Sequence, residues 1–335
     1  ALAQAAAQPG DTIVLDPAYG SETVTISVDA LTLDAGSGAD PVRLTLAATD
    51  LTAEGGRPLI INGGDADNTI DAGATTGGVR LNGGAGDDVL SGGSGNDRIV
   101  GGLGNDQLLG GGGNDVLISH DGSPFDDHDT DVMYGGAGND VYFVDGPDDE
   151  VHETAGEGID KAVVMSDFTL SAGSEVEIIQ ARGVTGQAIT GNEFANRIIG
   201  GTGDDTLDGG EGVDTAFYEH ATAGVTVKLL LTGNQATGGA GSDSLTNFEN
   251  ILGSSWNDNL SGNAGVNVIV GGAGDDTIDG RGGKDVLTGG AGADTFVFSN
   301  AAAAGNADTI TDFSVSEGDK FNLTQTVFNA INHMG

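Results

Sequence analysis

The sequence has no cysteine, so neither disulfide bonds nor thiol chemistry can contribute to its structure or function. Lysine and arginine are also scarce: 11 basic residues stand against 51 aspartates and glutamates, and the formal net charge is −40. A chain this acidic lacks the basic face that binding to nucleic acid or to an anionic membrane requires. Divalent cations are the partners that this charge favours.

Long apolar runs and aromatic side chains are missing as well. No segment approaches the roughly 18 apolar residues of a membrane-spanning helix, and residues 1–7 have neither the basic region nor the apolar stretch of a signal peptide. Aromatic residues make up 5% of the chain and glycine contributes 61 of its 335 residues, which argues against one conventional globular core. The hydrophobic fraction of 37% is nevertheless too high for a fully disordered chain, so we expect a soluble protein with conditional order.

The glycines follow a nine-residue period. Residues 83–118 read GGAGDDVLS GGSGNDRIV GGLGNDQLL GGGGNDVLI, with glycine at positions one, two and four, aspartate at position six and a large aliphatic residue at position eight. Glycine takes positive φ without steric cost, so each unit provides six residues of turn. The other three have room for a short strand with one inward side chain. Such units bury little alone and become stable only when several stack as a solenoid.

Stacking brings the position-six aspartates close together. If two units make one coil, aspartates two units apart lie above one another at the strand spacing of about 4.8 Å. With an effective dielectric constant of about 20, their repulsion is on the order of 3 kcal/mol per pair, so a cation must lie between them. Carboxylates and turn carbonyls are hard oxygen ligands in a flexible cage, which favours Ca²⁺ over Mg²⁺ or Zn²⁺.

The pattern GGxGxDxUx, in which U is a large apolar residue, resembles the repeat of RTX (repeats-in-toxin, hemolysin-type) proteins, a known Ca²⁺-binding β-helix repeat. The resemblance implies an all-β fold, a right-handed parallel β-roll or β-helix solenoid. It also implies that position-six aspartates and the carbonyls of the preceding turn bind several Ca²⁺ ions between units two apart. The aspartates are Asp88, Asp97, Asp106, Asp115, Asp131, Asp140, Asp205, Asp214, Asp258, Asp276, Asp285 and Asp294. The carbonyls are those of Gly83, Gly84, Gly86, Gly92, Gly93, Gly95, Gly101, Gly102, Gly104, Gly271, Gly272 and Gly274.

Some of these aspartates are expected to share an ion in pairs. The pairs are Asp88 with Asp106, Asp97 with Asp115, Asp258 with Asp276, and Asp276 with Asp294. Two amides interrupt the pattern: Asn267 stands opposite Asp285, and Asn196 fills position six in the first unit of a later array. Each amide removes one charge, so the two sites are expected to be weaker.

The repeats divide the chain into seven segments. They are N-terminal β-helix-like coils over 1–60, a first array over 61–143, a strand-rich connector over 144–190, a second array over 191–217, a connector over 218–252, a third array over 253–297 and a cap over 298–335. Residues 12–15 and 24–28 are expected to form strands in the first segment. In the connectors, residues 175–179 are expected to form a strand, and a partial repeat is expected near Gly238. The phrase at residues 9–19 resembles the opening coil of pectate-lyase-like parallel β-helices. Residues 294–298 and 308–313 resemble the carboxy-terminal cap of serralysin-type metalloproteases, which implies a final closing coil and a type I secretion signal.

One interruption of the first array raises a second metal hypothesis. Residues 119–129 combine two histidines with four aspartates, which is compatible with a zinc site or an extra calcium site. A solvated loop is the more economical interpretation, and we favour it.

No complete catalytic motif is present. His152-Glu153 begins an HExxH pattern, but residue 156 is glycine, so the second zinc ligand is missing and we expect an exposed acidic turn. Ser94 lies in GGSGN rather than GxSxG and is interpreted as a repeat turn. Tyr134, Tyr142, Phe143 and Trp256 are compatible with a sugar-stacking platform, but core packing is the favoured interpretation. We therefore expect no enzyme activity.

The sequence favours a secreted, extracellular or cell-surface Ca²⁺-binding module. Such a module would be exported unfolded through a type I secretion apparatus, fold on Ca²⁺ and support secretion, stability or display. The alternatives are the non-catalytic tail or part of a polysaccharide-modifying enzyme of the epimerase or lyase type, and a surface-layer or adhesive protein that contacts polysaccharide or a cell surface. What precedes Ala1 stays open.

Overall fold

The computed structural model describes residues 59–120, 129–300 and 306–324, together with the backbone of three short strands before residue 59. These residues form β-strands and turns and no helix, and the strands stack in parallel as a solenoid. The predicted all-β parallel solenoid is thereby confirmed. The chain divides into two compact units, residues 1–177 and 178–335, and each is described by itself.

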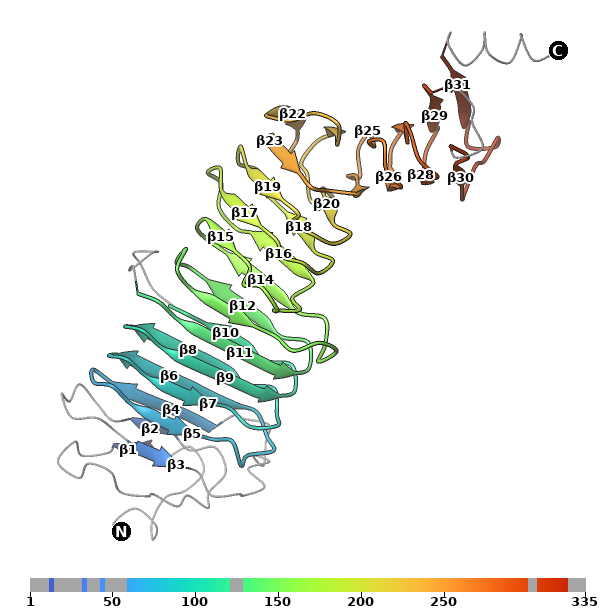
Figure 1. The fold of residues 1–335 in the computed structure, drawn as a ribbon. Helices are drawn as coiled ribbons and strands as arrows, with labels where there is room; N and C mark the ends of the chain where they lie inside the picture. Colours follow the sequence, from blue (N-terminus) through green and yellow to red (C-terminus); the bar gives the residue numbers. More distant parts are fainter. Residues whose placement is uncertain are drawn as a thin grey trace. The chain divides into compact units, whose positions relative to one another are not determined.

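The first unit contains two stacks of parallel strands (Figure 1). One stack has the order β1 (Thr12–Val14), β2 (Thr32–Asp34), β4 (Leu59–Gly64), β6 (Val79–Ala85), β8 (Arg98–Leu103), β10 (Val116–Ile118), β12 (Val141–Val144) and β14 (Lys161–Val164). The other has the order β3 (Arg43–Thr45), β5 (Thr69–Asp71), β7 (Val89–Ser91), β9 (Gln107–Gly112), β11 (Val132–Ala137) and β13 (Glu150–His152). From β2 to β14 the chain alternates between the stacks, so two strands make one coil.

The register shows that one coil of the array takes two nonapeptides. Leu90 on β7 pairs with Leu108 on β9, and Ile99 on β8 pairs with Leu117 on β10. All four position-eight side chains are 0% exposed. In the second unit Ile269, Ile278 and Leu287 are equally buried, which confirms that position eight builds the core.

Glycine at position two is required by close approach of the coils. Gly102 has φ of +121°, and a Cβ there would overlap the carbonyl oxygen of Gly84 one coil earlier. A side chain would therefore be strained by its backbone conformation and would also collide with backbone that cannot move aside.

The second unit has three sets of strands. The longest has the order β16 (Ile178–Ala181), β18 (Arg197–Ile199), β20 (Thr215–Phe217), β24 (Asn250–Leu252), β26 (Val268–Ala273), β28 (Val286–Ala291) and β30 (Thr309–Ile310). A second set comprises β17 (Ala188–Thr190), β19 (Thr206–Asp208), β23 (Gly241–Thr246) and β22 (Gln235–Gly238). A third comprises β21 (Thr226–Lys228), β25 (Asn259–Ser261), β27 (Thr277–Asp279), β29 (Thr295–Phe298) and β31 (Lys320–Leu323).

Two connectors differ from the sequence-based expectation. A partial repeat was expected near Gly238, but β22 and β23 form an antiparallel hairpin there, in which Gln235 pairs with Asp243 and Gly238 pairs with Gly241. A strand was expected over 175–179, but β16 begins at Ile178. The side chains of Glu175 and Glu177 instead accept hydrogen bonds from backbone N–H groups, at 2.8 and 2.7 Å.

The structure describes one of the two strands expected near the N-terminus. Residues 12–15 were expected to form a strand, and β1 spans the first three of them and pairs in parallel with β2. The second expected strand, residues 24–28, lies outside the described residues.

The end of the second unit continues the stacking. Strands β30 and β31 pair in parallel with β28 and β29. Phe313 stacks on Phe321 with ring centroids 4.3 Å apart, and Phe296 and Phe298 lie 6.2 and 5.9 Å from this pair. An aromatic cluster therefore takes the place of the single aliphatic side chain used in earlier coils.

The burial of position eight generates a stability prediction. Because Leu108 is 0% exposed, Leu108→Ala should lower the free energy of unfolding of the Ca²⁺-saturated chain by about 2–5 kcal/mol, through lost burial and a residual cavity. Leu103→Ala, at a side chain that is 48% exposed, should change it by less than about 0.5 kcal/mol. Denaturant titration of both variants measures the difference, and equal losses would contradict the inward placement of Leu108.

Candidate metal centres

The position-six aspartates are buried and form a hydrogen-bonded ladder along the coils. The backbone N–H of Asp88 donates to Oδ1 of Asp106 at 2.8 Å, and the N–H of Asp106 donates to Oδ1 of Asp131 at 2.8 Å. The other predicted pairs are joined in the same way: Asp97 N–H to Asp115 at 2.7 Å, Asp258 to Asp276 at 2.8 Å, Asp276 to Asp294 at 2.9 Å and Asn267 to Asp285 at 2.9 Å. The structure therefore brings the members of each predicted pair together.

The second carboxylate oxygen is the unusual feature of the ladder. In nine position-six aspartates Oδ2 is buried and has no hydrogen-bond partner. These are Asp88, Asp106, Asp115, Asp140, Asp205, Asp214, Asp276, Asp285 and Asp294. A buried oxygen without a partner costs about 1–3 kcal/mol, more when it is charged, so such atoms are rare unless a ligand satisfies them.

Three predicted aspartates, Asp97, Asp131 and Asp258, are not in this set, and the structure gives the Oδ2 partners of two of them. Oδ2 of Asp97 accepts the N–H of Gly93 at 2.7 Å, and Oδ2 of Asp258 accepts the N–H of Ser254 at 2.5 Å. The Ser254 hydroxyl also donates to Oδ1 of Asp258 at 2.8 Å. These two carboxylates are satisfied by their own turns, so they fit a cation less well than the nine above.

Several of the partnerless oxygens lie beside a backbone carbonyl of the next coil. A Cβ at Gly110 would overlap both Oδ2 of Asp115 and the carbonyl oxygen of Gly135, so these two oxygens converge on one point. The same convergence occurs at Gly83, Gly101 and Gly271. A carboxylate oxygen beside a carbonyl oxygen is a donor set for a hard cation such as Ca²⁺, so the residues present fit the ion that the repeat implies.

Only some of the predicted turn carbonyls lie beside an aspartate Oδ2. The position-one carbonyls of Gly101 and Gly271 lie beside an aspartate Oδ2. The position-two carbonyls of Gly84, Gly93 and Gly272 and the position-four carbonyls of Gly86, Gly95 and Gly274 lie against the matching glycine of the next coil instead. Position one is therefore the carbonyl that the structure joins to the carboxylate.

A second ladder, at position five, was missed in the sequence interpretation. Oδ1 of Asp87 accepts the N–H of Asn105 at 2.9 Å, and Oδ1 of Asn105 accepts the N–H of Thr130 at 2.9 Å. This ladder reaches forward by one coil, whereas the position-six ladder reaches back. Its signal was present, because each of the four consecutive units over residues 83–118 has Asp or Asn at position five.

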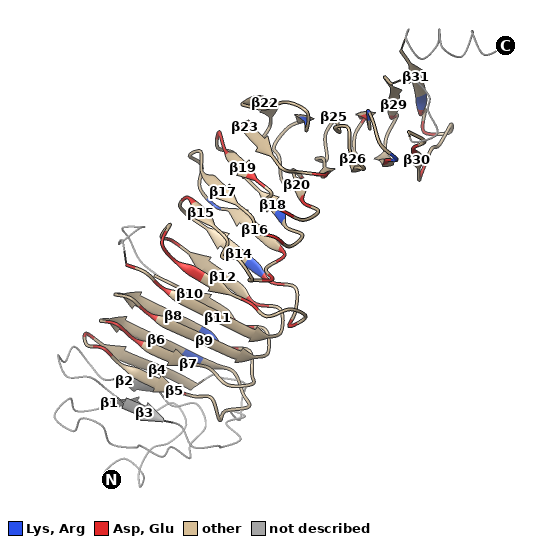
Figure 2. Ribbon diagram, viewed as in Figure 1, with Lys and Arg blue, Asp and Glu red and all other residues tan. Residues whose placement is uncertain are grey.

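Burial raises the pKa values of the position-six carboxyl groups. Desolvation raises the pKa of Asp106 to about 9, with a further contribution from the neighbouring charges of Asp131 and Asp88. It raises the pKa values of Asp88, Asp115 and Asp276 to about 7. Without a cation the folded state therefore disfavours the ionised form of these carboxylates. Figure 2 shows that acidic residues gather where strands meet turns, with few basic residues among them.

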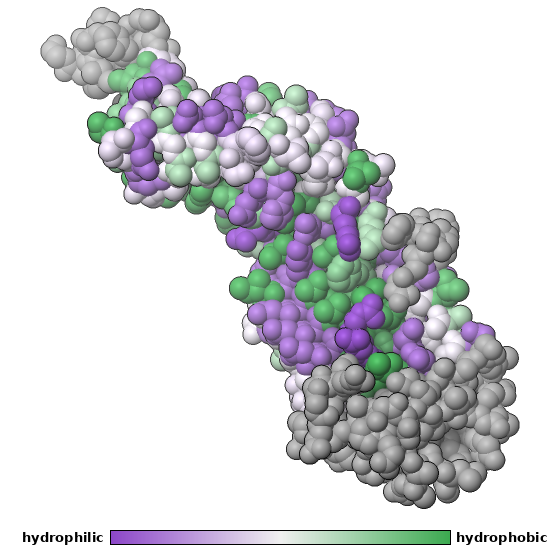
Figure 3. Space-filling model, turned by 180° about the vertical axis from the view of Figure 1, so that it is seen from behind, coloured by the Kyte–Doolittle hydropathy of each residue, from purple (hydrophilic) through white to green (hydrophobic). Residues whose placement is uncertain are grey.

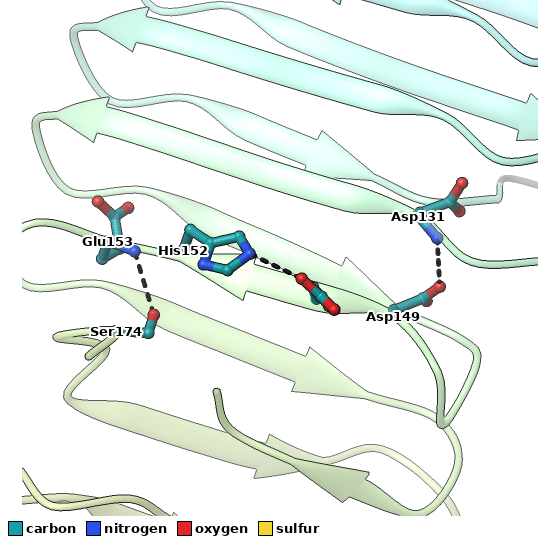
Figure 4. Close-up of polar contacts among 6 residues, drawn as sticks. Asp131, Asp149, His152, Glu153 and Ser174 are labelled. Carbon is teal, nitrogen blue, oxygen red and sulfur yellow. Dashed lines mark hydrogen bonds and ion pairs between the residues drawn. The ribbon is translucent and has the colours of Figure 1, made fainter. Parts of the chain in front are cut away.

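Two clusters of three carboxylates join the end of the first array to the segment after it. In each, one oxygen of every side chain lies within 4.8 Å of the others. One contains Asp131, Asp145 and Asp149; Asp149 accepts the N–H of Asp131 at 3.0 Å, drawn in Figure 4. The other contains Asp140, Glu153 and Asp160. Sequence reasoning found one residue of each, since the remaining four lie outside the nonapeptide period.

The expectation of an exposed acidic turn at His152-Glu153 was wrong. Residue 152 ends strand β13, and Glu153 is 5% exposed, with its N–H donating to the Ser174 hydroxyl at 3.1 Å (Figure 4). Parallel pairing with β11 orders this segment, so it is part of the solenoid. Residue 156 is still glycine, so the second histidine of an HExxH zinc site is absent.

The aromatic side chains divide between core and surface. Tyr142 is fully buried, as expected, and Phe143 is half-buried, whereas Tyr134 and Trp256 are 38% and 53% exposed, so the core interpretation was wrong for these two. Tyr134 is at position nine, one residue past the inward position, and stacks on His152 with ring centroids 4.9 Å apart.

The face drawn in Figure 3 exposes both hydrophobic and hydrophilic residues.

The interruption of the first array is described at its two ends. Ser119 is buried, and Nδ1 of His120 lies 3.0 Å from the carbonyl oxygen of Gly102. Residues 121–128, which include His128 and most of the aspartates of the zinc hypothesis, lie outside the described residues.

Comparison with protein families gives one match. The model described as RTX calcium-binding nonapeptide repeat matches in four places, residues 82–117, 127–149, 189–217 and 253–296. A search of curated proteins gave no match. In the part of the chain that the structure describes, no helix has the length and hydropathy needed to cross a membrane.

The convergence at position-one glycine gives a prediction with a matched control. Gly110→Ala would place a methyl group between Oδ2 of Asp115 and the Gly135 carbonyl, so Ca²⁺ affinity should fall by roughly 10- to 100-fold at one site. At Gly112, two residues on, the nearest atom to an added Cβ is 3.8 Å away, so Gly112→Ala should leave binding unchanged. Isothermal titration compares the two, and equal effects would exclude a special role for position one.

The raised pKa values predict that acid stabilises the metal-free fold. In the unfolded chain these carboxyl groups titrate near 3.8, whereas in the folded chain values reach about 7 and about 9. Between pH 4 and pH 9, roughly, the folded chain binds more protons than the unfolded chain, so its stability falls as pH rises. The metal-free chain should therefore show more strand signal by circular dichroism at about pH 5 than at about pH 8, while Ca²⁺ affinity is lower at pH 5 because protons compete. Strand signal that rises with pH would contradict this.

Proposed function

The chain carries four blocks of the RTX calcium-binding nonapeptide repeat, and from that premise we propose that it is a secreted Ca²⁺-binding β-roll module that folds when it binds Ca²⁺ outside the cell. Its role is to support secretion, stability or display. The observation that carries the proposal is the set of buried aspartate Oδ2 atoms without hydrogen-bond partners. Beside those of Asp88, Asp115 and Asp276 lies a position-one glycine carbonyl of the next coil.

The position-six aspartates are the proposed ligands. Asp88, Asp106 and Asp115 in the first array, and Asp276 and Asp294 in the third, each offer one Oδ2, while Oδ1 accepts a backbone N–H of the coil before. When bound, Ca²⁺ supplies the positive charge that offsets carboxylates stacked one coil apart. Asp97 and Asp258 are weaker candidates, because their Oδ2 atoms already accept hydrogen bonds from their own turns.

The energetic balance supports folding that depends on Ca²⁺. The chain has an excess of 40 negative charges, and its 61 glycines make the turns costly in entropy. Each coil adds only a pair of inward aliphatic side chains, so the metal-free balance favours the unfolded state. Each independent site adds about 2.7 kcal/mol when free Ca²⁺ exceeds its Kd a hundredfold, and several sites reverse the balance.

This dependence suits export. A chain that stays unfolded at low cytosolic Ca²⁺ can pass through a narrow type I channel and then fold in the higher Ca²⁺ outside the cell. The absence of cysteine is consistent with a design in which bound ions take the place of disulfide cross-links. We propose no catalytic role, because a carboxylate that binds Ca²⁺ is held ionised and is unsuited to act as an acid.

The test combines folding and stoichiometry. Circular dichroism should show little strand signal in EGTA and strong strand signal in millimolar Ca²⁺ at neutral pH. By isothermal titration, Asp106→Ala should lose sites, since its Oδ1 accepts the N–H of Asp88 in the coil before and its Oδ2 lies beside the Ser119 carbonyl of the next coil.

Asp87→Ala is the matched control. Asp87 belongs to the exposed position-five ladder, so its replacement should leave the stoichiometry unchanged. Equal strand signal with and without Ca²⁺ would refute folding on Ca²⁺, and unchanged stoichiometry in Asp106→Ala would remove this aspartate from the ligands.

A further inference from the structure

The first array ends in a coil that lacks the usual neighbour. In the preceding coils, the position-one glycine and the aspartate Oδ2 face a backbone carbonyl of the next coil, as Gly110 and Asp115 face Gly135. After Gly135 the nonapeptide period stops. A Cβ at Gly135 would overlap Oδ2 of Asp140, Oε1 of Glu153 and the Tyr142 hydroxyl, with no carbonyl among these nearest atoms. A carboxylate therefore stands where each earlier coil presents a carbonyl.

Three elements bring the carboxylates together. Asp140 precedes β12, Glu153 follows β13, and Asp160 precedes β14. One oxygen from each lies within 4.8 Å of the others, and all three side chains are at most 5% exposed. No lysine or arginine contributes an ion pair to them among the described residues, so three negative charges share one buried space.

The hydrogen bonds leave specific atoms unsatisfied. Asp140 uses Oδ1 to accept the N–H of Asp115 at 2.6 Å, and Asp160 uses Oδ1 to accept the N–H of Asp140 at 2.7 Å. The Tyr142 hydroxyl donates to Oε1 of Glu153. Oδ2 of Asp140 and Oε2 of Glu153 are buried without a partner. Since Glu153 is 95% withdrawn from solvent, its free oxygen needs a ligand inside the protein.

The end of another array shows a different solution. In the second unit Asp243 accepts the N–H of Asp205 at 3.0 Å, and its Oδ2 accepts the hydroxyls of Tyr218 at 3.1 Å and Thr237 at 3.0 Å. Those two donors satisfy the oxygen. A tyrosine beside a carboxylate is thus not enough to indicate a site, and the distinguishing features at Glu153 are the three carboxylates and the oxygens left without donors.

We propose that Asp140, Glu153 and Asp160 bind one further Ca²⁺ at a tricarboxylate site that closes the first array and is tighter than the sites between two nonapeptide turns. The choice of Ca²⁺ rests on the proposed function. The higher affinity follows from ligand charge, because the site replaces a neutral carbonyl with a carboxylate and ligand charge sets the affinity of such sites over several orders of magnitude.

The test uses the full chain with Ca²⁺ and with Tb³⁺, whose emission a nearby tyrosine excites. Glu153→Gln keeps the size of the side chain and removes one charge, so the tightest Ca²⁺ step should weaken by roughly tenfold or more. The same variant should lose the part of the tyrosine-excited Tb³⁺ emission that Tyr142→Phe removes. Glu150→Gln is the control, because Glu150 begins the strand β13 that Glu153 follows and its side chain is 52% exposed, so it should change neither quantity.

Tyr142→Phe is a second variant that keeps the proposal testable if Glu153→Gln does not fold. It keeps all three carboxylates, so it should retain the tightest Ca²⁺ step while losing Tb³⁺ emission. The proposal is overturned if Glu153→Gln retains the tightest step and the emission, if Glu150→Gln loses as much, or if Tyr142→Phe retains full emission. Failure of the proposed function looks different: the wild-type chain would then bind no Ca²⁺. Loss of sites in Asp106→Ala together with a wild-type result for Glu153→Gln would refute this inference alone.

Discussion

The structure depends on a contact between each position-six carboxylate and the backbone of the coil before it. Asp106 accepts the N–H of Asp88 at 2.8 Å, which fixes the coil spacing and places two carboxylates one above the other. The same contact uses one oxygen and leaves Oδ2 of both residues without a hydrogen-bond donor. The interaction that aligns the coils thus creates a buried negative charge, and protons or cations must offset it. Burial raises the pKa of Asp106 to about 9, so without a cation this carboxyl group favours its protonated, uncharged form.

Glycine makes this arrangement possible by what it lacks. At position two, Gly102 adopts a positive φ and approaches the Gly84 carbonyl more closely than any side chain would allow. At position one, Gly110 has an ordinary φ but leaves open the space on which Oδ2 of Asp115 and the Gly135 carbonyl converge. The position-two glycine is therefore needed for the backbone conformation, and the position-one glycine is needed to leave space for the metal-binding oxygens. Each glycine loses more backbone conformational entropy on folding than another residue would. The few aliphatic side chains of each coil offset little of this loss, so folding without an ion is unfavourable.

Periodicity predicted what repeats and missed what does not. The position-eight core and the stacked aspartate pairs follow from a nine-residue rule, because any residue two units on must occupy the same place in the next coil. Glu153 and Asp160 obey no such rule. They reach the Asp140 carboxylate through strand pairing across a connector of irregular length, which sequence spacing does not encode. The hairpin of β22 and β23 escaped prediction for a related reason, since two short polar strands around glycine carry little periodic signal.

The two polar ladders run in opposite directions, and this explains why the ends of the arrays matter. Position six reaches back one coil and position five reaches forward, so every interior turn both gives and receives contacts. A terminal coil lacks one set and needs substitutes from outside the period. Asp312 accepts the N–H groups of Gly289 and Gly290 at 3.0 and 2.8 Å, and Asp319 accepts that of Asp294 at 3.0 Å. Residues after the third array therefore supply the acceptors that a further nonapeptide would have given, as Asp160 does after the first by accepting the N–H of Asp140. In a solenoid whose stability is a sum of neighbour contacts, such substitutes decide where the ordered stack ends.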